Sequence, residues 1–387
     1  MTAPRAYLDH NASAPLLPEA RAAMLAALDA GGNASSVHGE GRAARRLVEA
    51  ARRQVAALVG ATPAHVVFTS GATEAASTLL TPDWRMGRAP LRMARLYVCA
   101  ADHPCLLSGG RFAPADISVF GIDGDGIADL AALEAMLAAH ARQAGLPLVA
   151  VHAANNETGV IQPVAEIARV VKAAGGVLVV DAVQAAGRIP IDISSGWGDF
   201  LILSSHKIGG PQGAGAIVGV SDLMMPAPLV RGGGQEKGHR AGTENVAAVV
   251  GFGAAADVAR ARLPEMAAVA ALRDMAEATL RELAPGATIY GEGAPRLANT
   301  SFFAIPGVKA ETAQIAFDLA GVALSAGSAC SSGRVGPSHV LKAMGHDGGD
   351  GALRVSLGHS TTAEEIAMFR SALAKLVGRR TETNRAA

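Results

Sequence analysis

Two short polar segments directly follow predicted apolar strands. Ser70-Gly71-Ala72-Thr73 comes after a strand predicted at 66–70. The free N–H groups of a helix beginning there, together with the Thr73 hydroxyl, could bind an anion. Asp181 ends a strand predicted at 177–181, and ligands of open α/β sheets bind at the carboxyl ends of strands. Taken alone, the turn at 70–73 fits an ordinary capped helix better than an anion site, and Asp181 fits a helix N-cap equally well.

A lysine also follows a predicted apolar strand. Lys207 follows a strand predicted at 200–204 and precedes a Gly-Gly-Pro turn, in a chain with six lysines. A partly desolvated lysine can form a Schiff base, whereas an ordinary loop lysine is the structural alternative. The three features together match pyridoxal phosphate: the turn could hold its phosphate, Asp181 could keep its pyridine nitrogen protonated, and Lys207 could bind its aldehyde.

The elements that must position these groups alternate along the chain. Apolar strands separated by amphipathic helices predict an α/β fold with a mixed, mostly parallel sheet between helices. After about residue 258 an alanine-rich helix is predicted at 259–284, and a shorter α/β pattern follows. We therefore expect a large cofactor-binding domain at 13–258 and a smaller domain formed by 1–12 and 259–387.

Composition narrows the class of protein. The 387 residues include 34 Lys+Arg and 34 Asp+Glu, so charge gives no case for nucleic acid or an anionic membrane as a partner. No basic segment followed by an apolar run opens the chain, and no apolar stretch reaches the ~20 residues of a membrane span. The three cysteines lack the spacing of a disulfide framework or a CxxC metal site. These features predict a cytoplasmic globular protein.

Many short motifs, in order along nearly the whole chain, resemble one family. The chain is similar to the cysteine desulfurases of the NifS/IscS type, in the class V aminotransferase group of fold-type I pyridoxal-phosphate enzymes. This resemblance implies a large domain and a smaller C-terminal α/β domain. The motifs are Tyr7-Leu8-Asp9, Thr69-Ser70-Gly71-Ala72-Thr73-Glu74, Asp102-His103, Asn155-Asn156-Glu157-Thr158-Gly159, Asp181-Ala182-Val183-Gln184, Ser204-Ser205-His206-Lys207, Arg240-Ala241-Gly242-Thr243, Gly327-Ser328-Ala329-Cys330-Ser331-Ser332-Gly333 and Arg354-Val355-Ser356-Leu357-Gly358.

The resemblance assigns roles around the cofactor ring. Lys207 would carry the cofactor and later move the proton at the substrate Cα. His103 would stack on the ring and take part in acid–base chemistry, and Asp181 would pair with the ring nitrogen. Gln184 and Asn155 would reach the phenolic oxygen.

The resemblance also assigns the phosphate and the substrate carboxylate. Arg354 would bind the substrate carboxylate through its planar fork, with Asn155 beside it. Thr243 would contact the phosphate of the partner subunit, which implies a homodimer with shared sites. The phosphate of the same subunit would be held by Ala72, Thr73, Ser204 and His206.

Cys330 is the nucleophile that the resemblance implies. It lies in a Ser/Gly-rich segment, at about 326–337, whose composition suits a loop. Cys99 falls in a predicted strand and suits a small buried residue, whereas Cys105 follows His103 closely enough to stay a weaker candidate. No resident metal is expected, and any iron–sulfur contact at Cys330 would be transient.

The activity implied is conversion of L-cysteine to L-alanine, with sulfur carried as a persulfide on Cys330. The acceptor would be an iron–sulfur scaffold or a sulfur-carrier protein, for iron–sulfur cluster assembly or tRNA thiolation. Two alternatives stay open. One is a related pyridoxal-phosphate aminotransferase or lyase, including selenocysteine lyase, and the other is a sulfur-carrier partner without catalytic activity.

Overall fold

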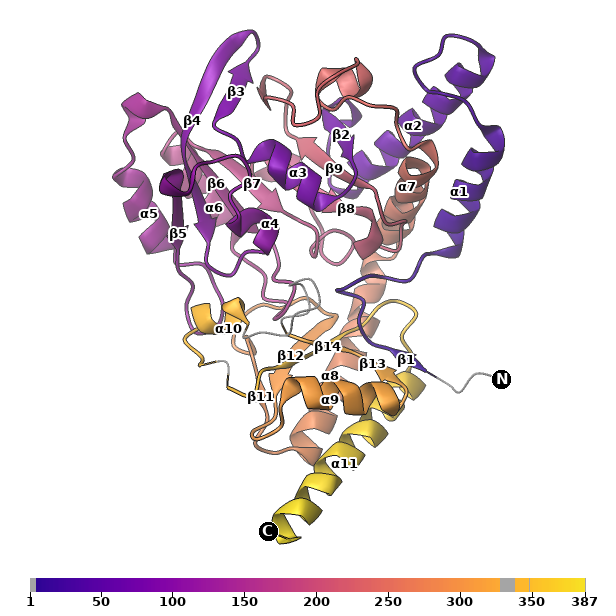
Figure 1. Ribbon diagram of the computed structural model, residues 1–387, viewed down its shortest axis with the longest axis vertical. Coiled ribbons are helices and arrows are strands. Elements are labelled where there is room, and N and C mark those ends of the chain that lie inside the picture. The colour runs from indigo at the N-terminus through magenta and orange to yellow at the C-terminus, as the bar shows by residue number, and fades with distance from the viewer. Residues whose placement is uncertain (1–4, 328–337, 348, 387) are drawn as a thin grey trace.

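The computed structural model describes residues 5–327, 338–347 and 349–386. Within them the chain forms a large sheet with helices on both faces and a smaller sheet below it, with both termini at the small-sheet end (Figure 1). This arrangement confirms the predicted α/β class with a mixed sheet between helices.

The large sheet positions the predicted cofactor groups. Its nine described strands run in the order β10-β3-β4-β6-β7-β8-β9-β2, and β5 pairs with β4. Neighbours from β5 to β8 are parallel, whereas β9 and β2 are antiparallel to the strands beside them. Every residue of β7 and β8 is buried, which explains their continuous apolar sequence. The bounds are β2 Val66–Thr69, β3 Asp83–Met86, β4 Ala89–Cys99, β5 Ile117–Phe120, β6 Leu146–His152, β7 Val177–Asp181, β8 Phe200–Ser204, β9 Gly215–Gly219 and β10 Met224–Pro226.

Helices cover the two faces of the large sheet unequally. One face packs against the apolar sides of four helices: α2 (Gly39–Leu58), α5 (Leu130–Ala138), α6 (Val164–Ala173) and α7 (Val246–Ala261). The other face is covered by two shorter helices, α3 (Ala72–Leu79) and α4 (Pro104–Leu107). Helix α1 (Pro18–Ala30) lies against α7. The thinner cover on the second face leaves room near the strand ends.

The smaller sheet has its own core. Four antiparallel strands run in the order β11-β12-β15-β14, and β1 pairs in parallel with β13. Three helices pack their apolar residues against these strands: α8 (Met266–Leu283), α9 (Ala310–Leu319) and α11 (Ala363–Ala386). The strands are β1 Ala6–Tyr7, β11 Thr288–Ile289, β12 Thr300–Ala304, β13 Val322–Ala323, β14 Ser325–Ala326 and β15 Leu353–Ser356, and the short helix α10 is His339–Ala343.

Two predicted elements differ from the structure. The single helix predicted at 259–284 is two helices, because α7 ends at Ala261 and a 3-10 turn containing Pro264 precedes α8. Proline lacks the N–H that would continue the hydrogen-bond ladder. The sequence also predicts a helix at 129–144, but in the structure this helix ends at Ala138. Among the described residues, no helix combines the length and the hydropathy that crossing a membrane requires.

Candidate active site

A cavity of ≈ 520 Å³ opens where β7 and β8 end and α3 begins. The common edge follows from parallel strands, whose carboxyl ends meet on one side of the sheet. Asn155, Thr243 and Arg354 are not part of the cavity wall, and Cys330 lies outside the described residues. The predicted residues that do line it are Ala72, Thr73, His103, Asp181, Gln184, Ser204, His206 and Lys207.

The turn from β2 into α3 forms one end of this cavity. Ser70, Ala72 and Thr73 line the wall, so the first-turn N–H groups of the helix lie beside the open volume. Glu74 fixes the turn, because its Oε2 accepts the N–H of Ser70 at 2.8 Å while its Oε1 accepts from Arg240 at 3.0 Å. The turn has the donors that an anion requires.

Asp181 supplies a buried carboxylate to the wall of the same cavity. Burial raises the pKa of Asp181 to about 6, although the N–H of Val183 opposes this by donating to Oδ1 at 3.0 Å. A cationic ligand group beside this carboxylate would restore the favourable charge balance that burial removes. The protonated nitrogen of a pyridine ring is such a group.

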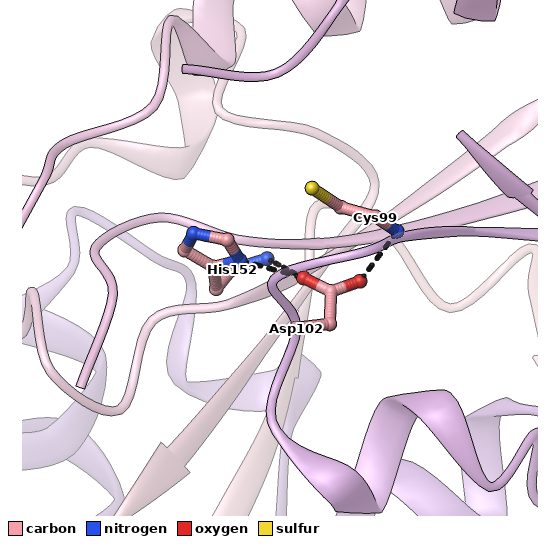
Figure 2. A group of neighbouring side chains, drawn as sticks. All are labelled: Cys99, Asp102 and His152. Carbon is pink, nitrogen blue, oxygen red and sulfur yellow. Dashed lines mark hydrogen bonds and ion pairs between the residues drawn. The ribbon is translucent and has the colours of Figure 1, made fainter. Parts of the chain in front are cut away.

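On β6, the strand beside Asp181, His152 forms a buried hydrogen-bonded pair with Asp102. Figure 2 shows this pair. The carboxylate of Asp102 accepts the N–H of Cys99 at 2.8 Å and the Nδ1 of His152 at 2.6 Å. His152 Nε2 lies 3.1 Å from the amide nitrogen of Gln162. These bonds occupy both ring nitrogens, so the closeness of Cys99, Asp102 and His152 is explained without a metal. They also fix the turn that leads into His103.

His103 is held as a neutral ring with a defined tautomer. Its Nδ1 accepts the N–H of Cys105 at 3.2 Å, at the start of α4. Burial, followed by the charges of Lys207 and His339, lowers the pKa of His103 to about 4. The ring proton is therefore on Nε2. Burial also raises the pKa of the Cys105 thiol, which keeps that thiol protonated.

The N-terminal segment 9–14 passes beside Lys207, which sequence reasoning did not anticipate. Lys207 Nζ donates to the carbonyl oxygens of Asn11 at 2.7 Å and Ala12 at 2.8 Å. Ser13 Oγ lies 3.2 Å from His206 Nδ1. The motifs of the sequence carried no signal for the lysine contacts, because these use backbone oxygens that any residue provides.

The two adjacent asparagines lie in different surroundings. Asn155 is committed to the backbone: its Nδ2 donates to Ala101, and its Oδ1 accepts the N–H groups of Glu157 and Thr158. Asn156, rather than Asn155, lines the cavity. Neighbouring asparagines cannot be distinguished by type, so only the structure tells which one faces the ligand space.

Arg354 lies on β15 of the small sheet and is 2% exposed. Its Nη2 donates to Asp9 Oδ1 at 2.8 Å, and its Nη1 donates to the carbonyl of Asn156 at 2.9 Å. Its Nε is buried without a hydrogen-bond partner among the described residues. Arg354 therefore reaches the cavity region through Asn156 and retains an unused donor.

The residues on either side of segment 328–337, which itself lies outside the described residues, are hydrogen-bonded to the rest of the chain. Before it, the N–H of Gly327 donates to Ala352 at 2.7 Å. After it, Ser338 Oγ donates to Glu157 Oε2 at 2.5 Å, and His339 Nε2 lies 2.9 Å from the Asp102 carbonyl. Gly327 therefore lies beside the small sheet, and Ser338 and His339 contact the turns that contain Glu157 and Asp102.

Thr243 lies on the far side of the anion-binding turn. It lines a separate cavity of ≈ 210 Å³ with Thr69, Ser70 and Arg240. Ser70 borders both cavities. In this chain Thr243 therefore lies away from the main cavity.

The donor set of the main cavity fits pyridoxal phosphate. An anion-binding turn, a buried carboxylate and a primary amine line this one cavity, and each can bind one functional group of that cofactor. Residues 6–369 match the family model described as aminotransferase class V, and the chain belongs to this family. Members of the family depend on pyridoxal phosphate.

Individual relatives cover almost the whole chain. A protein of Cereibacter sphaeroides described as cysteine desulfurase is 40% identical over 94% of this chain and 93% of its own length. The structure of a NifS-like protein from Rickettsia africae superposes with a TM-score of 0.84 at 33% identity, covering 96% of this chain and 99% of that one. The structure titled SspA in complex with cysteine superposes with a TM-score of 0.74 at 26% identity. The match covers 92% of this chain and 100% of that one.

Proposed function

We propose that this protein is a cysteine desulfurase that converts L-cysteine to L-alanine and passes the sulfur to Cys330 as a persulfide. The observation that carries this proposal is the single cavity that joins the Lys207 amine, the buried Asp181 carboxylate and the anion-binding turn. A relative described as cysteine desulfurase at 40% identity, and a structural relative in complex with cysteine, support the substrate.

The large-sheet side would hold the cofactor. When bound, pyridoxal phosphate supplies an electron sink for the charge that forms at the substrate Cα. Asp181 would keep the ring nitrogen protonated, and Lys207 would bind the aldehyde and later move the proton at the substrate Cα. Ala72, Thr73, Ser204 and His206 would hold the phosphate, together with Thr243 of a second subunit in a homodimer.

His103 would donate a hydrogen bond rather than transfer a proton, because its resting form is the neutral ring. Its Nδ1 is engaged with the N–H of Cys105, so the Nε2 hydrogen is the one available to a reacting group. The low pKa of His103, about 4, makes its protonated form a strong acid and its neutral form the resting state. Lys207 lowers that pKa, which couples the two groups electrostatically.

Arg354 and Asn156 would bind the substrate α-carboxylate. Arg354 has an unused Nε donor, and Asn156 lines the cavity while its carbonyl accepts from Arg354. Asn156 therefore takes the contact with substrate that the resemblance gave to Asn155. A guanidinium held in this way can bind a carboxylate through two parallel hydrogen bonds.

Sulfur transfer would use Cys330. A new bond forms between the Cys330 thiolate and the substrate sulfur, and the bond from that sulfur to the substrate Cβ breaks. The Cβ then takes up a proton to give alanine. The contacts of Ser338 and His339 with Glu157 and Asp102 support this role, because Glu157 and Asp102 are sequence neighbours of the cavity residues Asn156 and His103.

We also propose the wider setting of this reaction. The chain would divide into a cofactor domain at 13–258 and a small domain formed by 1–12 and 259–387. The persulfide would pass to an iron–sulfur scaffold or a sulfur-carrier protein in the cytoplasm, for cluster assembly or tRNA thiolation.

The test uses the holoenzyme and its Cys330→Ser variant. After addition of L-cysteine, an alkylating reagent should trap a persulfide on the Cys330 peptide of the wild type, with alanine in equal amount. The variant should keep the cofactor spectrum but form no persulfide, because serine cannot accept the sulfur. Cys105→Ser is the matched control and should behave as the wild type. Alanine release at the wild-type rate from Cys330→Ser would instead indicate a lyase.

A further inference from the structure

Arg188 is a buried arginine whose partners are all neutral. It follows Gln184 by four residues in the turn after β7, and its Nη1 donates to the Gln184 carbonyl at 2.9 Å and to Gln184 Oε1. Its Nη2 lies 3.4 Å from the carbonyl of Lys207. Among the described residues no carboxylate contacts Arg188. A guanidinium is costly to bury on neutral oxygens alone, so a positional role would account for its presence.

The contacts of Gln184 define which way its amide points. A guanidinium can only donate hydrogen bonds, so the atom of Gln184 that faces Arg188 must be the oxygen. A backbone carbonyl can only accept, so the atom that lies 3.1 Å from the oxygen of Asn11 must be the nitrogen. The two contacts therefore agree on one orientation. The amide nitrogen has a second hydrogen, and Gln184 lines the cofactor cavity.

The groups around Arg188 are mostly basic. His10 and His359 share a cavity wall with it, and burial together with the Arg188 charge lowers the pKa of His10 to about 4. Arg262 lies on the same wall, and Arg354 acts on Arg188 from β15. The carboxylates that contact Arg262 and His359 are those of Glu19 and Glu265, and neither contacts Arg188. Burial and then Arg354 lower the pKa of Arg188 to about 9, which leaves it charged at neutral pH.

We propose that Arg188 is a positioning residue that holds the Gln184 amide with its N–H toward the cofactor's phenolic oxygen and strengthens that N–H as a donor. A charged donor on Oε1 polarises the amide, and hydrogen bonds in such a chain reinforce one another. The inference rests on the proposed function, and on the contact between Gln184 and the phenolic oxygen that the family resemblance implies. Its consequence is a lower proton affinity of the cofactor where it joins Lys207.

The test is a pH titration of the cofactor absorption in the holoenzyme. Arg188→Met should raise the midpoint by about 1 pH unit, or ~10-fold in proton affinity, because the phenolic oxygen loses a polarised donor. Arg188→Lys retains the charge and should restore most of the shift. Arg262→Met removes a charge from the same cavity wall without touching Gln184, so its midpoint should stay at the wild-type value. If the methionine variant does not fold, Arg188→Gln serves, since a neutral amide lacks the charge that polarises Gln184.

Variants of Gln184 separate the positioning role of Arg188 from the contact between Gln184 and the cofactor. A shifted midpoint in Gln184→Leu with an unchanged one in Arg188→Met would overturn the positioning role alone. An unchanged midpoint in Gln184→Leu would refute the contact between Gln184 and the cofactor. In the double variant, Arg188→Met should add little to Gln184→Leu, because the arginine acts through the amide. If Arg188→Met shifts the midpoint as much in the Gln184→Leu background as it does alone, the Arg188 charge acts directly on the cofactor, which would contradict the inference.

Discussion

Two buried arginines divide the site into unlike halves. Arg188, on the large-sheet side, contacts Gln184 four residues away and Lys207 on the next strand end, all through neutral oxygens. Arg354, on the small-sheet side, pairs with the Asp9 carboxylate, 345 positions distant in sequence, and with Asn156, 198 positions distant. The large-sheet half is thus built from local turns at neighbouring strand ends. The small-sheet half exists only when remote segments meet.

The difference has a consequence for variants. Side chains of the large-sheet half point into the cavity and contact mainly backbone oxygens, so their loss should impair chemistry more than folding. Groups of the small-sheet half hold segments together through charges, so their loss should reduce stability as well. Three variants test this contrast, beginning with the largest expected effect.

Lys207→Ala should abolish turnover while changing stability little. The amine is the group that binds the cofactor, and removal of such a group lowers rates by more than about 10³-fold. The carbonyls of Asn11 and Ala12, to which the amine donates, face a cavity where water can replace it. Alanine production and urea unfolding of the apoprotein measure the two effects. Retention of a borohydride-fixed cofactor in this variant would place the reactive amine elsewhere.

Asp9→Asn should destabilise the apoprotein by about 3 kcal/mol, because it leaves the buried Arg354 charge without a counter-ion. Added L-alanine, the proposed product, brings a carboxylate to Arg354. It should therefore raise the melting temperature of the variant by more than that of the wild type. Thermal unfolding with and without L-alanine measures both the destabilisation of the variant and its stabilisation by L-alanine.

Asp318→Asn is the matched control for that experiment. Asp318 also pairs with an arginine, Arg5, but both side chains are more than half exposed. Exposed pairs contribute about 0–1 kcal/mol, so this variant should unfold close to the wild type. Equal destabilisation by the two substitutions would remove the contrast between buried and exposed pairs.

Glu157→Gln should change how stability depends on pH. Burial raises the pKa of Glu157 from 4.5 to about 7. Between these values the native state holds a proton that the unfolded chain has lost, so this group makes stability fall as pH rises. Glutamine resembles the protonated acid and does not titrate. The wild type should therefore lose about 2 kcal/mol relative to the variant between pH 5 and pH 8, as urea unfolding would show. A parallel pH dependence of the two proteins would contradict the raised pKa, and the exposed Glu311→Gln serves as control.

The sequence by itself predicted the large-sheet half well. An apolar run that ends in a charged residue is a local pattern, and parallel strands bring such ends to one edge. The sequence pattern therefore sufficed to place Asp181 and Lys207 together, and both lie in one cavity wall. The same reasoning placed most strands, since β7 and β8 are buried along their whole length and read as continuous apolar runs.

Only the tertiary structure decided the remaining features. It separated Asn155 from Asn156, because adjacent side chains leave a turn in different directions and sequence records no direction. It paired Asp9 with Arg354 and laid segment 9–14 beside Lys207, through contacts between segments that sequence order keeps far apart. It also showed that Arg188, which no motif distinguished, is buried on neutral oxygens. Burial and the identity of distant neighbours determine charge balance, and neither is set by the local sequence.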